Sequence, residues 1–318
     1  MLIAVDLKIS KNESADQSVA ISNLSIKSGE QIAKDTYAKI KLRKEIELLK
    51  QTQLPLWPDE QRAIPNGILR SALFSAIQSN AKRYIDGEKI ASLSGIEIRY
   101  TGQSLDQGDL GVWEAVLHIL KHQNLGVKCY TSTYYILKLL GLTDTGSNRT
   151  ILYKRLTRLV ATALELEQGK YRYIGSLITE AERDISTGKI FIILNPKIIS
   201  LFQSDQYTHI HFELCHALKK PLAKWLYRFY ATHAKPFPLK IETIHRLCGS
   251  YAKTLTDFKK HTLKNALEEV SKVSAAYGKK FEYEIKGDLL HIMKSGNSSQ
   301  LKYITKKTVD KLPSQRTY

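Results

Sequence analysis

The same order of predicted secondary-structure elements occurs twice in this chain of 318 residues. In the first copy, "STYYILKLLG" (132–141) predicts a short helix and "SNRTILYKRLTRLVATAL" (147–164) a longer one, and apolar segments after them predict two strands. The second copy follows about 107 residues later, as a short helix, a long helix and two strands over 241–249, 254–273 and 279–294. A helix-turn-helix followed by a two-stranded wing is a unit that docks on DNA. We therefore expect an α+β chain built from two tandem winged-helix domains.

The strands of each copy are expected to form its wing. In the first copy they are "KYRYIGSLIT" (170–179) and "GKIFIILNP" (188–196), joined by the charged loop "EAERDIS". In the second copy the two strands turn at Gly287-Asp288.

Three more helices and one hairpin are predicted outside these copies. Apolar residues at helical spacing predict helices over 65–78, 109–123 and 222–233. Alternation over 89–102 predicts a hairpin that turns at Ser94-Gly95.

The domain boundaries follow from composition. Residues 1–52 have the polar composition of a flexible leader, with a charged helix expected over 37–50. We place the first winged-helix domain at 53–195, the second at 196–296, and a polar tail at 297–318.

Positive charge is concentrated toward the C-terminal end. The chain has 48 basic and 31 acidic side chains, a formal net charge of +17. Residues 196–318 alone hold 22 basic and 10 acidic side chains. Such an excess makes a polyanion the first partner to consider, and we expect double-stranded DNA bound mainly by the second domain. The alternative is that the lysines only hydrate the surface.

Several classes of function lack sequence support. Cys129, Cys215 and Cys248 are odd in number and far apart, which fits a reducing compartment and argues against a disulfide framework or a cysteine zinc site. The first residues have too short an apolar run for a signal peptide, and no stretch approaches the ~20 apolar residues of a membrane span. No GxxxxGK(S/T), GxGxxG or GxSxG motif occurs. We expect a cytoplasmic protein that is not an enzyme and uses no cofactor.

The long helix expected over 254–273 has an apolar and a polar face. The apolar positions are Leu255, Phe258, Leu263, Ala266, Leu267 and Val270. The outward positions, expected to bind DNA, are Thr256, Lys259, Lys260, Lys264 and Asn265. Lysines suit phosphates, whereas threonine and asparagine suit base edges. Three lysines beside or within the following strands, expected to add phosphate contacts, are Lys279, Lys280 and Lys286. A merely solvated helix face is the alternative.

The long helix of the first copy offers a second set of basic residues. They are Arg149, Lys154, Arg155 and Arg158, with Tyr153 among them. Because the first domain is nearly neutral overall, this face is expected to bind DNA, a second copy of the protein, or both.

A rival interpretation comes from "YTHIHFEL" (207–214). His209 and His211 would face the same side of a strand, and such a pair with a nearby tyrosine resembles the metal-dependent nicking site of rolling-circle replication endonucleases. Tyr227 or Tyr230 would be the nucleophile. Histidines that pack in the core or lie on the surface are the commoner outcome, and we expect no metal.

Three blocks of sequence carry a family resemblance. They are "LPLWPDEQRAIPNGILRSALF" (54–74), "RYIDGEKIASLSGIEIRYTG" (83–102) and "VWEAVLHI" (112–119). Through them the chain resembles the TrfA family of plasmid replication initiators, from about residue 53 to about residue 293.

The resemblance implies a double winged-helix protein that binds direct repeats (iterons) in a plasmid origin. It further implies opening of an adjacent AT-rich region, contact with the opened single strand, and recruitment of the host initiator ATPase and the replicative helicase. Self-association into a dimer, with the monomer as the DNA-binding form, is expected as well. A winged-helix transcriptional repressor is a further alternative, because it would share the fold and the basic helix.

A proline-framed strip precedes the first domain. Pro55 and Pro58 keep the stretch extended. The residues of the strip are Gln53, Leu54, Leu56 and Trp57. They are similar to the Gln-Leu-x-Leu-Phe peptide by which bacterial proteins dock on the replicative sliding clamp, a partner that this strip would therefore bind. The alternative is that its apolar side chains pack against the chain's own first domain.

Overall fold

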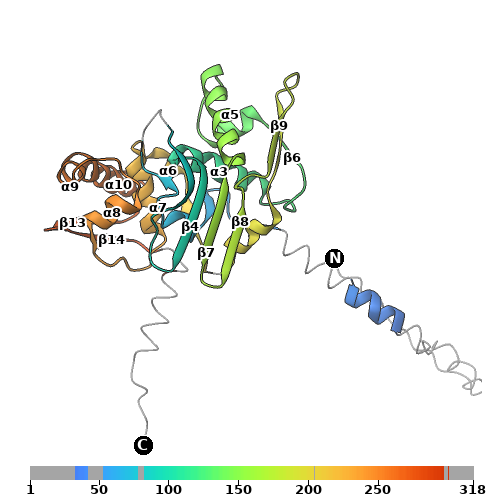
Figure 1. Ribbon diagram of the computed structural model, residues 1–318, viewed down its shortest axis with the longest axis horizontal. Helices are drawn as coiled ribbons and strands as arrows, with labels where there is room; N and C mark the ends of the chain where they lie inside the picture. Colours follow the sequence, from blue (N-terminus) through green and yellow to red (C-terminus); the bar gives the residue numbers. More distant parts are fainter. Residues whose placement is uncertain (1–32, 42–52, 78–81, 204, 297–299, 301–318) are drawn as a thin grey trace, which may run out of the picture. The chain divides into compact units, whose positions relative to one another are not determined.

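The computed structural model describes residues 33–41, 53–77, 82–203, 205–296 and 300. The chain divides into two compact units, Met1–Lys50 and Gln51–Tyr318. In the first unit, residues 33–41 form a helix (Figure 1), which includes the beginning of the helix expected over 37–50. The rest of that helix, most of the leader and the tail other than residue 300 lie outside the described residues.

Two copies of one order of elements make up most of the larger unit. The first module, residues 107–193, contains α3 (Gln107–Leu120), β6 (Cys129–Ser132), α4 (Thr133–Leu139), α5 (Gly146–Val160), β9 (Glu180–Arg183) and β10 (Lys189–Ile193). The second module, residues 221–294, contains α7 (Pro221–Ala231), β12 (Leu239–Lys240), α8 (Ile241–Leu247), α9 (Leu255–Asp257), a π-helical segment (Phe258–Leu263), α10 (Lys264–Ala276), β13 (Phe281–Lys286) and β14 (Leu289–Lys294).

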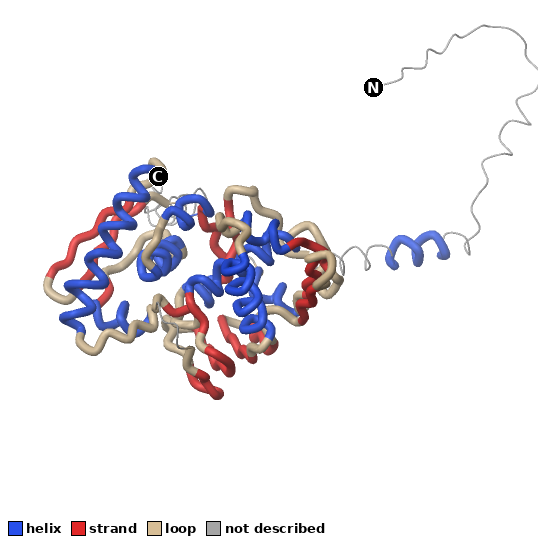
Figure 2. The backbone as a smooth tube through the Cα atoms, turned by 90° about the horizontal axis from the view of Figure 1, so that it is seen from above, coloured by secondary structure: helices blue, strands red, loops and turns tan. Residues whose placement is uncertain are grey.

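Both modules end in a three-stranded antiparallel sheet with the same strand order. In the first, β10 lies between β6 and β9; in the second, β14 lies between β12 and β13. Each hairpin thus pairs back on the short strand that follows the module's first helix. The elements of the second module gather at the left end of the larger unit in both views (Figure 1, Figure 2). The doubled order and the α+β content expected from the sequence are therefore observed.

The strand pairing of the first module differs from the expectation. The strand within 170–179 does not form a hairpin with the one within 188–196, although the Thr179 backbone N–H donates to the Ile193 carbonyl oxygen at 2.9 Å. Instead, β8 (Tyr171–Gly175) joins β3 (Tyr84–Lys89), β4 (Ile96–Gln103) and β7 (Ala163–Gln168) in a separate four-stranded sheet. The partner of β10 is β9, which lies within the segment expected to be a charged loop. Three of the four β9 side chains are exposed, so this strand has no apolar alternation to reveal it.

The hairpin expected over 89–102 is present as β3 and β4. Gly95 in its turn has φ +82°, a conformation that favours glycine. The helix expected over 147–164 ends at Val160, because Ala163 already belongs to β7.

The prediction of a helix over 65–78 is wrong. The chain there forms α2 (Asn66–Leu69), a single turn, and then β2 (Phe74–Ser75), which pairs with β5 (Leu105–Asp106). Before α2, β1 (Gln61–Pro65) pairs with β11 (Tyr207–His211). Leu69 and Leu73 are buried, as their spacing indicated, but long-range pairing overrides the local helical pattern.

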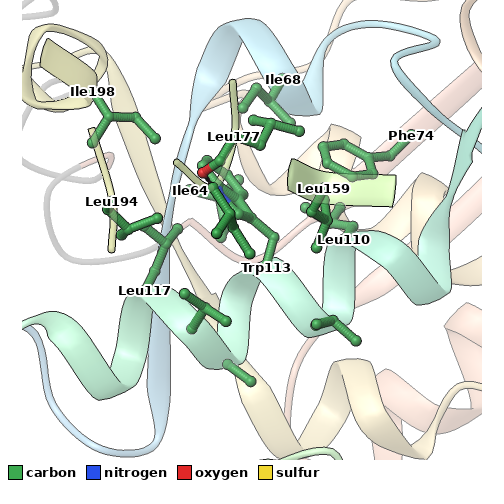
Figure 3. Packing of buried hydrophobic residues seen from close by; sticks show 14 of the residues in the cluster. Ile64, Ile68, Phe74, Leu110, Trp113, Leu117, Leu159, Leu177, Leu194 and Ile198 are labelled. Carbon is green, nitrogen blue, oxygen red and sulfur yellow. Dashed lines mark hydrogen bonds between the residues drawn. The ribbon is translucent and has the colours of Figure 1, made fainter. Parts of the chain in front are cut away.

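Two hydrophobic clusters form the cores. The first surrounds Trp113 on α3, whose indole Nε1 donates a hydrogen bond to the Leu177 carbonyl oxygen at 3.1 Å (Figure 3). The second lies under the long helix of the second module, where Phe258, Leu267 and Phe229 are fully buried. Two further helices that the structure describes in the larger unit are a 3₁₀ helix (Pro196–Phe202) and α6 (Phe212–Ala217).

A buried ion pair joins the two modules. The guanidinium of Arg228 on α7 donates to both carboxylate oxygens of Glu114 on α3, at 3.0 and 2.6 Å, and to the Gln107 side-chain oxygen at 2.6 Å. The side chains of Arg228 and Glu114 are 5% and 7% exposed. A buried charge is tolerated when it is paired and hydrogen-bonded in this way.

Removing one partner of this pair should therefore be costly. We expect Glu114→Ala to lower the free energy of unfolding by about 3–5 kcal/mol, because it leaves the Arg228 charge buried with only a neutral partner. Urea unfolding followed by circular dichroism measures the loss. Glu97→Ala is the matched control, since the exposed Glu97–Lys89 pair should contribute less than about 1 kcal/mol. Equal, small losses in the two variants would contradict a structural role for the buried pair.

Candidate nucleic-acid interface

The long helix of the second module begins at a side-chain cap. The Thr254 hydroxyl oxygen accepts a hydrogen bond from the Asp257 backbone N–H at 3.1 Å and donates to the Asp257 carboxylate at 2.7 Å. Five of the six positions expected to be apolar and inward are fully buried: Phe258, Leu263, Ala266, Leu267 and Val270. Leu255 is the exception, at 45% exposed.

A π-helical segment makes this burial possible. Phe258 and Leu263 are five residues apart, which is too far for one face of an α-helix at 3.6 residues per turn. The wider turn of the π segment Phe258–Leu263 brings both side chains into the core. The polar residues between them are consequently turned outward together.

The outward residues line a groove between the helix and the β13–β14 hairpin of the module. The groove has a volume of about 800 Å³ and is lined by Thr256, Lys259, Lys260 and Lys264, together with residues of β12, α8, β13 and the hairpin turn Gly287-Asp288. Four of the five predicted helix residues are thus brought together. The fifth, Asn265, lies outside the lining and donates to the His261 carbonyl oxygen at 2.7 Å.

The lysines of the groove differ in how they are held. The Lys259 ammonium donates to the Gly287 carbonyl oxygen at 2.6 Å and lies 3.9 Å from the Asp288 carboxylate, so it links the helix to the hairpin turn. Lys260 and Lys264 are exposed, and neither forms an ion pair with any residue that the structure describes. These two ammonium groups are available to an anion.

The predicted wing lysines divide between two places. Lys286 ends β13 at the hairpin turn, 3.0 Å from the Glu284 carboxylate and directly before Gly287. Lys279 and Lys280 instead follow the C-terminal end of the helix, which is about 30 Å long from Leu255 to Ala276. They line a different hollow, so the eight predicted residues do not form one surface.

In the first module, three of the five predicted residues are engaged within the protein. Arg158 donates to the buried Asp109 carboxylate at 2.5 Å and is only 14% exposed. Arg155 lies over Gly108 at the start of α3. The Tyr153 hydroxyl is 2.6 Å from the Thr133 hydroxyl, and its ring lies under the Arg183 guanidinium.

The other two basic residues of α5 face outward. Arg149 forms a two-pronged pair with the Asp144 carboxylate, at 2.5 and 2.7 Å, but remains 47% exposed. Lys154 is exposed and forms no ion pair with a described residue. Sequence spacing could not separate these two from Arg158, because the partner of Arg158 is 49 residues away in the chain.

The proline-framed strip packs against the first module. Leu54 and Trp57 are 3% and 4% exposed, whereas Leu56 is 68% exposed. The Trp57 indole N–H donates to His118 Nδ1 at 3.3 Å, and the Lys121 ammonium donates to the Trp57 carbonyl oxygen at 3.0 Å. Gln53 forms an isolated bridge with Asn124. In this structure the strip therefore packs against the chain's own first module, which was the alternative to docking on the sliding clamp.

The residues of the nicking interpretation are only partly assembled. His209 and His211 share one side of β11, and both line the same hollow as Tyr227. Burial raises the pKa of Tyr227, which keeps its hydroxyl protonated. Tyr230 is 1% exposed in the second core. Within the described ranges, no three His, Cys, Asp or Glu side chains are grouped to hold a metal ion.

Comparison with known proteins identifies a family model and a relative that match this chain. The family model described as "TrfA protein" matches residues 14–292. The plasmid replication initiator protein TrfA of Escherichia coli is 30% identical over 216 residues, which cover 64% of this chain and 56% of that protein. The chain thus spans just over half the length of this relative.

Two solved structures are also similar. Domains 2 and 3 of RctB match with 12% identity and a TM-score of 0.48, covering 73% of this chain and 96% of that one. The Pi initiator protein in complex with iteron DNA matches with 14% identity and a TM-score of 0.44, covering 59% of this chain and 91% of that one. In the part of the chain that the structure describes, no helix is both long and apolar enough to cross a membrane.

The contact between the strip and the first module should depend on pH. Burial, followed by the charges of Arg62 and Lys121, lowers the pKa of His118 to about 4. Because this value is below that of an unfolded histidine, about 6.5, the unfolded chain takes up the proton first and stability is lost as pH falls from about 6.5 toward 4.

Between about pH 6.5 and pH 4, we expect the free energy of unfolding to fall less in His118→Gln than in the wild type. The reason is that glutamine can accept a hydrogen bond from the Trp57 indole without titrating. Urea midpoints at about pH 7 and about pH 5 measure the difference. Parallel losses in the two proteins would show that His118 does not carry this dependence.

Proposed function

The chain belongs to the TrfA family, and on that premise we propose that it is a plasmid replication initiator that binds direct repeats in an origin. The activity is that of its Escherichia coli relative, the plasmid replication initiator protein TrfA. The observation that carries the proposal is the groove of the second module, where exposed lysines gather on one side of a helix that is buried on the other.

Each module is assigned as a winged helix. The support is the order helix, short strand, helix, helix and hairpin in both, and the identical strand order of their sheets. In this fold the last helix, here α5 or the helix Leu255–Ala276, enters the major groove. The two modules correspond to domains at 53–195 and 196–296, each reading one part of a repeat.

Within the second module, the proposed contacts have different roles. Lys260 and Lys264 would bind phosphates, because each presents an ammonium that no described residue pairs with. Thr256 lies at the start of the helix, the end that reaches base edges in this type of docking. Lys259 is assigned to holding the wing turn near the helix, and Lys286 to a backbone contact at that turn.

The first module is assigned fewer DNA contacts than its sequence indicated. We retain Lys154 and Arg149, because they project from α5. Arg158 is left out, because its guanidinium is bonded to buried Asp109. The face of α5 has few free cations, so we propose that it also pairs with a second copy of the chain. Because pairing would cover this face, the monomer is proposed as the form that binds DNA.

We further propose that the protein opens an adjacent AT-rich region. It would then recruit the host initiator ATPase, the replicative helicase and the sliding clamp. No catalytic residue is assigned. Clamp binding through the strip would require Leu54 and Trp57 to leave the first module, where both are buried. Such a docked strip belongs to a different state of the protein from the one described here.

The contribution of the two exposed lysines can be measured from salt dependence. We expect Lys260→Ala and Lys264→Ala each to weaken binding to the origin repeats and to reduce the slope of log K against log salt by about 0.9, the loss of one phosphate contact. Fluorescence anisotropy with a labelled repeat at several salt concentrations gives both quantities.

Lys197→Ala is the matched control, because Lys197 is an exposed lysine on the 3₁₀ helix outside the groove. Its affinity and slope should equal those of the wild type. Unchanged slopes in the Lys260 and Lys264 variants would remove this helix from the DNA interface.

A further inference from the structure

A second basic hollow lies at the opposite end of the second module from the proposed DNA groove. Its volume is about 280 Å³, just below the range of about 300–1,000 Å³ for drug-sized ligand sites, and thus a size for a small ion or group. It is formed where β11 and α7 meet the residues that follow α10 and the end of β14. Its lining includes Lys279, Lys280, Lys294, His209 and His211.

The lining is cationic and lacks a countercharge. No acidic side chain is among the described residues that line the hollow. Lys280 has a carboxylate nearby, that of Glu282 at 3.0 Å, but both groups are about half exposed, so this pair is weak. Lys279 is exposed and forms no ion pair with a described residue.

Lys294 is the least favourably placed of the three cations. It is half-buried, and among the described residues its ammonium donates to neutral oxygens only, those of the Ser295 backbone at 3.3 Å and the Gln300 side chain at 3.0 Å. Burial lowers its pKa to about 8, so the ammonium form persists at neutral pH without a carboxylate partner. A bound anion would supply the missing charge.

His209 adds a polar atom without a partner. Its Nε2 is buried and forms no hydrogen bond with the residues that the structure describes. A neutral imidazole carries one N–H, and because His209 lines the hollow, its ring is a candidate donor to an oxyanion bound there. His211 lies on the same side of β11 and widens the set of nitrogen donors.

The same charges argue against a divalent metal between the two histidines. The three ammonium groups would repel a metal cation, and no described carboxylate lines the hollow to offset their charge. The same groups attract an oxyanion, and lysines bind phosphate as point charges.

We propose that this hollow is a phosphate-binding site, filled by a phosphate or diphosphate group that Lys294, Lys279 and His209 recognise. The group has two sources of the same chemistry: a free phosphate or diphosphate, or a backbone phosphate of bound DNA. Because Lys279 lies at the far end of a helix about 30 Å long, a backbone phosphate here would belong to a stretch of DNA other than the one in the groove.

Isothermal titration of the full chain with inorganic phosphate and with pyrophosphate, at constant ionic strength, tests the first source. The wild type should bind at least one of them. Lys294→Gln and Lys279→Gln should each weaken binding about tenfold or more, whereas Lys197→Gln should leave it unchanged. Lys279 is exposed, so its variant reports on the site even if replacing Lys294 disturbs folding.

Salt-dependent binding of the same variants to DNA fragments that extend beyond the repeats tests the second source. A slope reduced by about 0.9 in Lys279→Gln, with no phosphate binding in the calorimeter, would assign the hollow to the DNA backbone. Wild-type behaviour of Lys279→Gln and Lys294→Gln in both assays would overturn the proposal. The calorimetric arm contains no DNA, so its result is independent of whether the protein binds origin repeats.

Discussion

The buried guanidinium of Arg228 is the constraint on which the arrangement of the larger unit depends. A charge removed from water must be met by fixed partners, and here these are Glu114 and Gln107 on the first helix of the other module. The same helix, α7, contributes Trp225 and Phe229 to the second core. The indole of Trp225 donates to the Ser71 carbonyl oxygen, and Arg70 donates to the backbone and hydroxyl of Thr232 just after α7. These bonds fix α7 against both the first module and the segment that precedes it.

The doubled order of elements was predictable because it depends on local periodicity. The long helix of the second module was found from its apolar stripe, and the lysines of its other face were identified from the same pattern. The π-helical segment was not predicted, although the five-residue spacing from Phe258 to Leu263 is a signal for it. Residues 65–78 show the limit of periodicity, because their pairing partners lie far away in the chain.

The candidate site was predicted less completely than the fold, for a physical reason. Whether a basic side chain is available depends on the carboxylates that the tertiary fold brings to it. Arg158 and Lys154 look equivalent in the sequence, yet Asp109 holds one and leaves the other exposed. Lys279 and Lys286 lie seven positions apart, but the extended strand β13 (Phe281–Lys286) runs from one to the other and carries them to opposite ends of the hairpin. Trp57 has the pattern of an exposed docking residue, but it is buried against a helix that begins about 50 residues later.

The start of the helix Leu255–Ala276 is proposed to enter the major groove of an origin repeat. Site-directed cleavage tests this docking most directly, because Cys129, Cys215 and Cys248 are all buried and an added surface cysteine can be labelled selectively. An iron chelate attached to Thr256→Cys should cut the DNA within each repeat, whereas the same label on Lys197→Cys should not. A labelled Thr256→Cys protein that still binds the repeats and leaves them uncut would contradict the account.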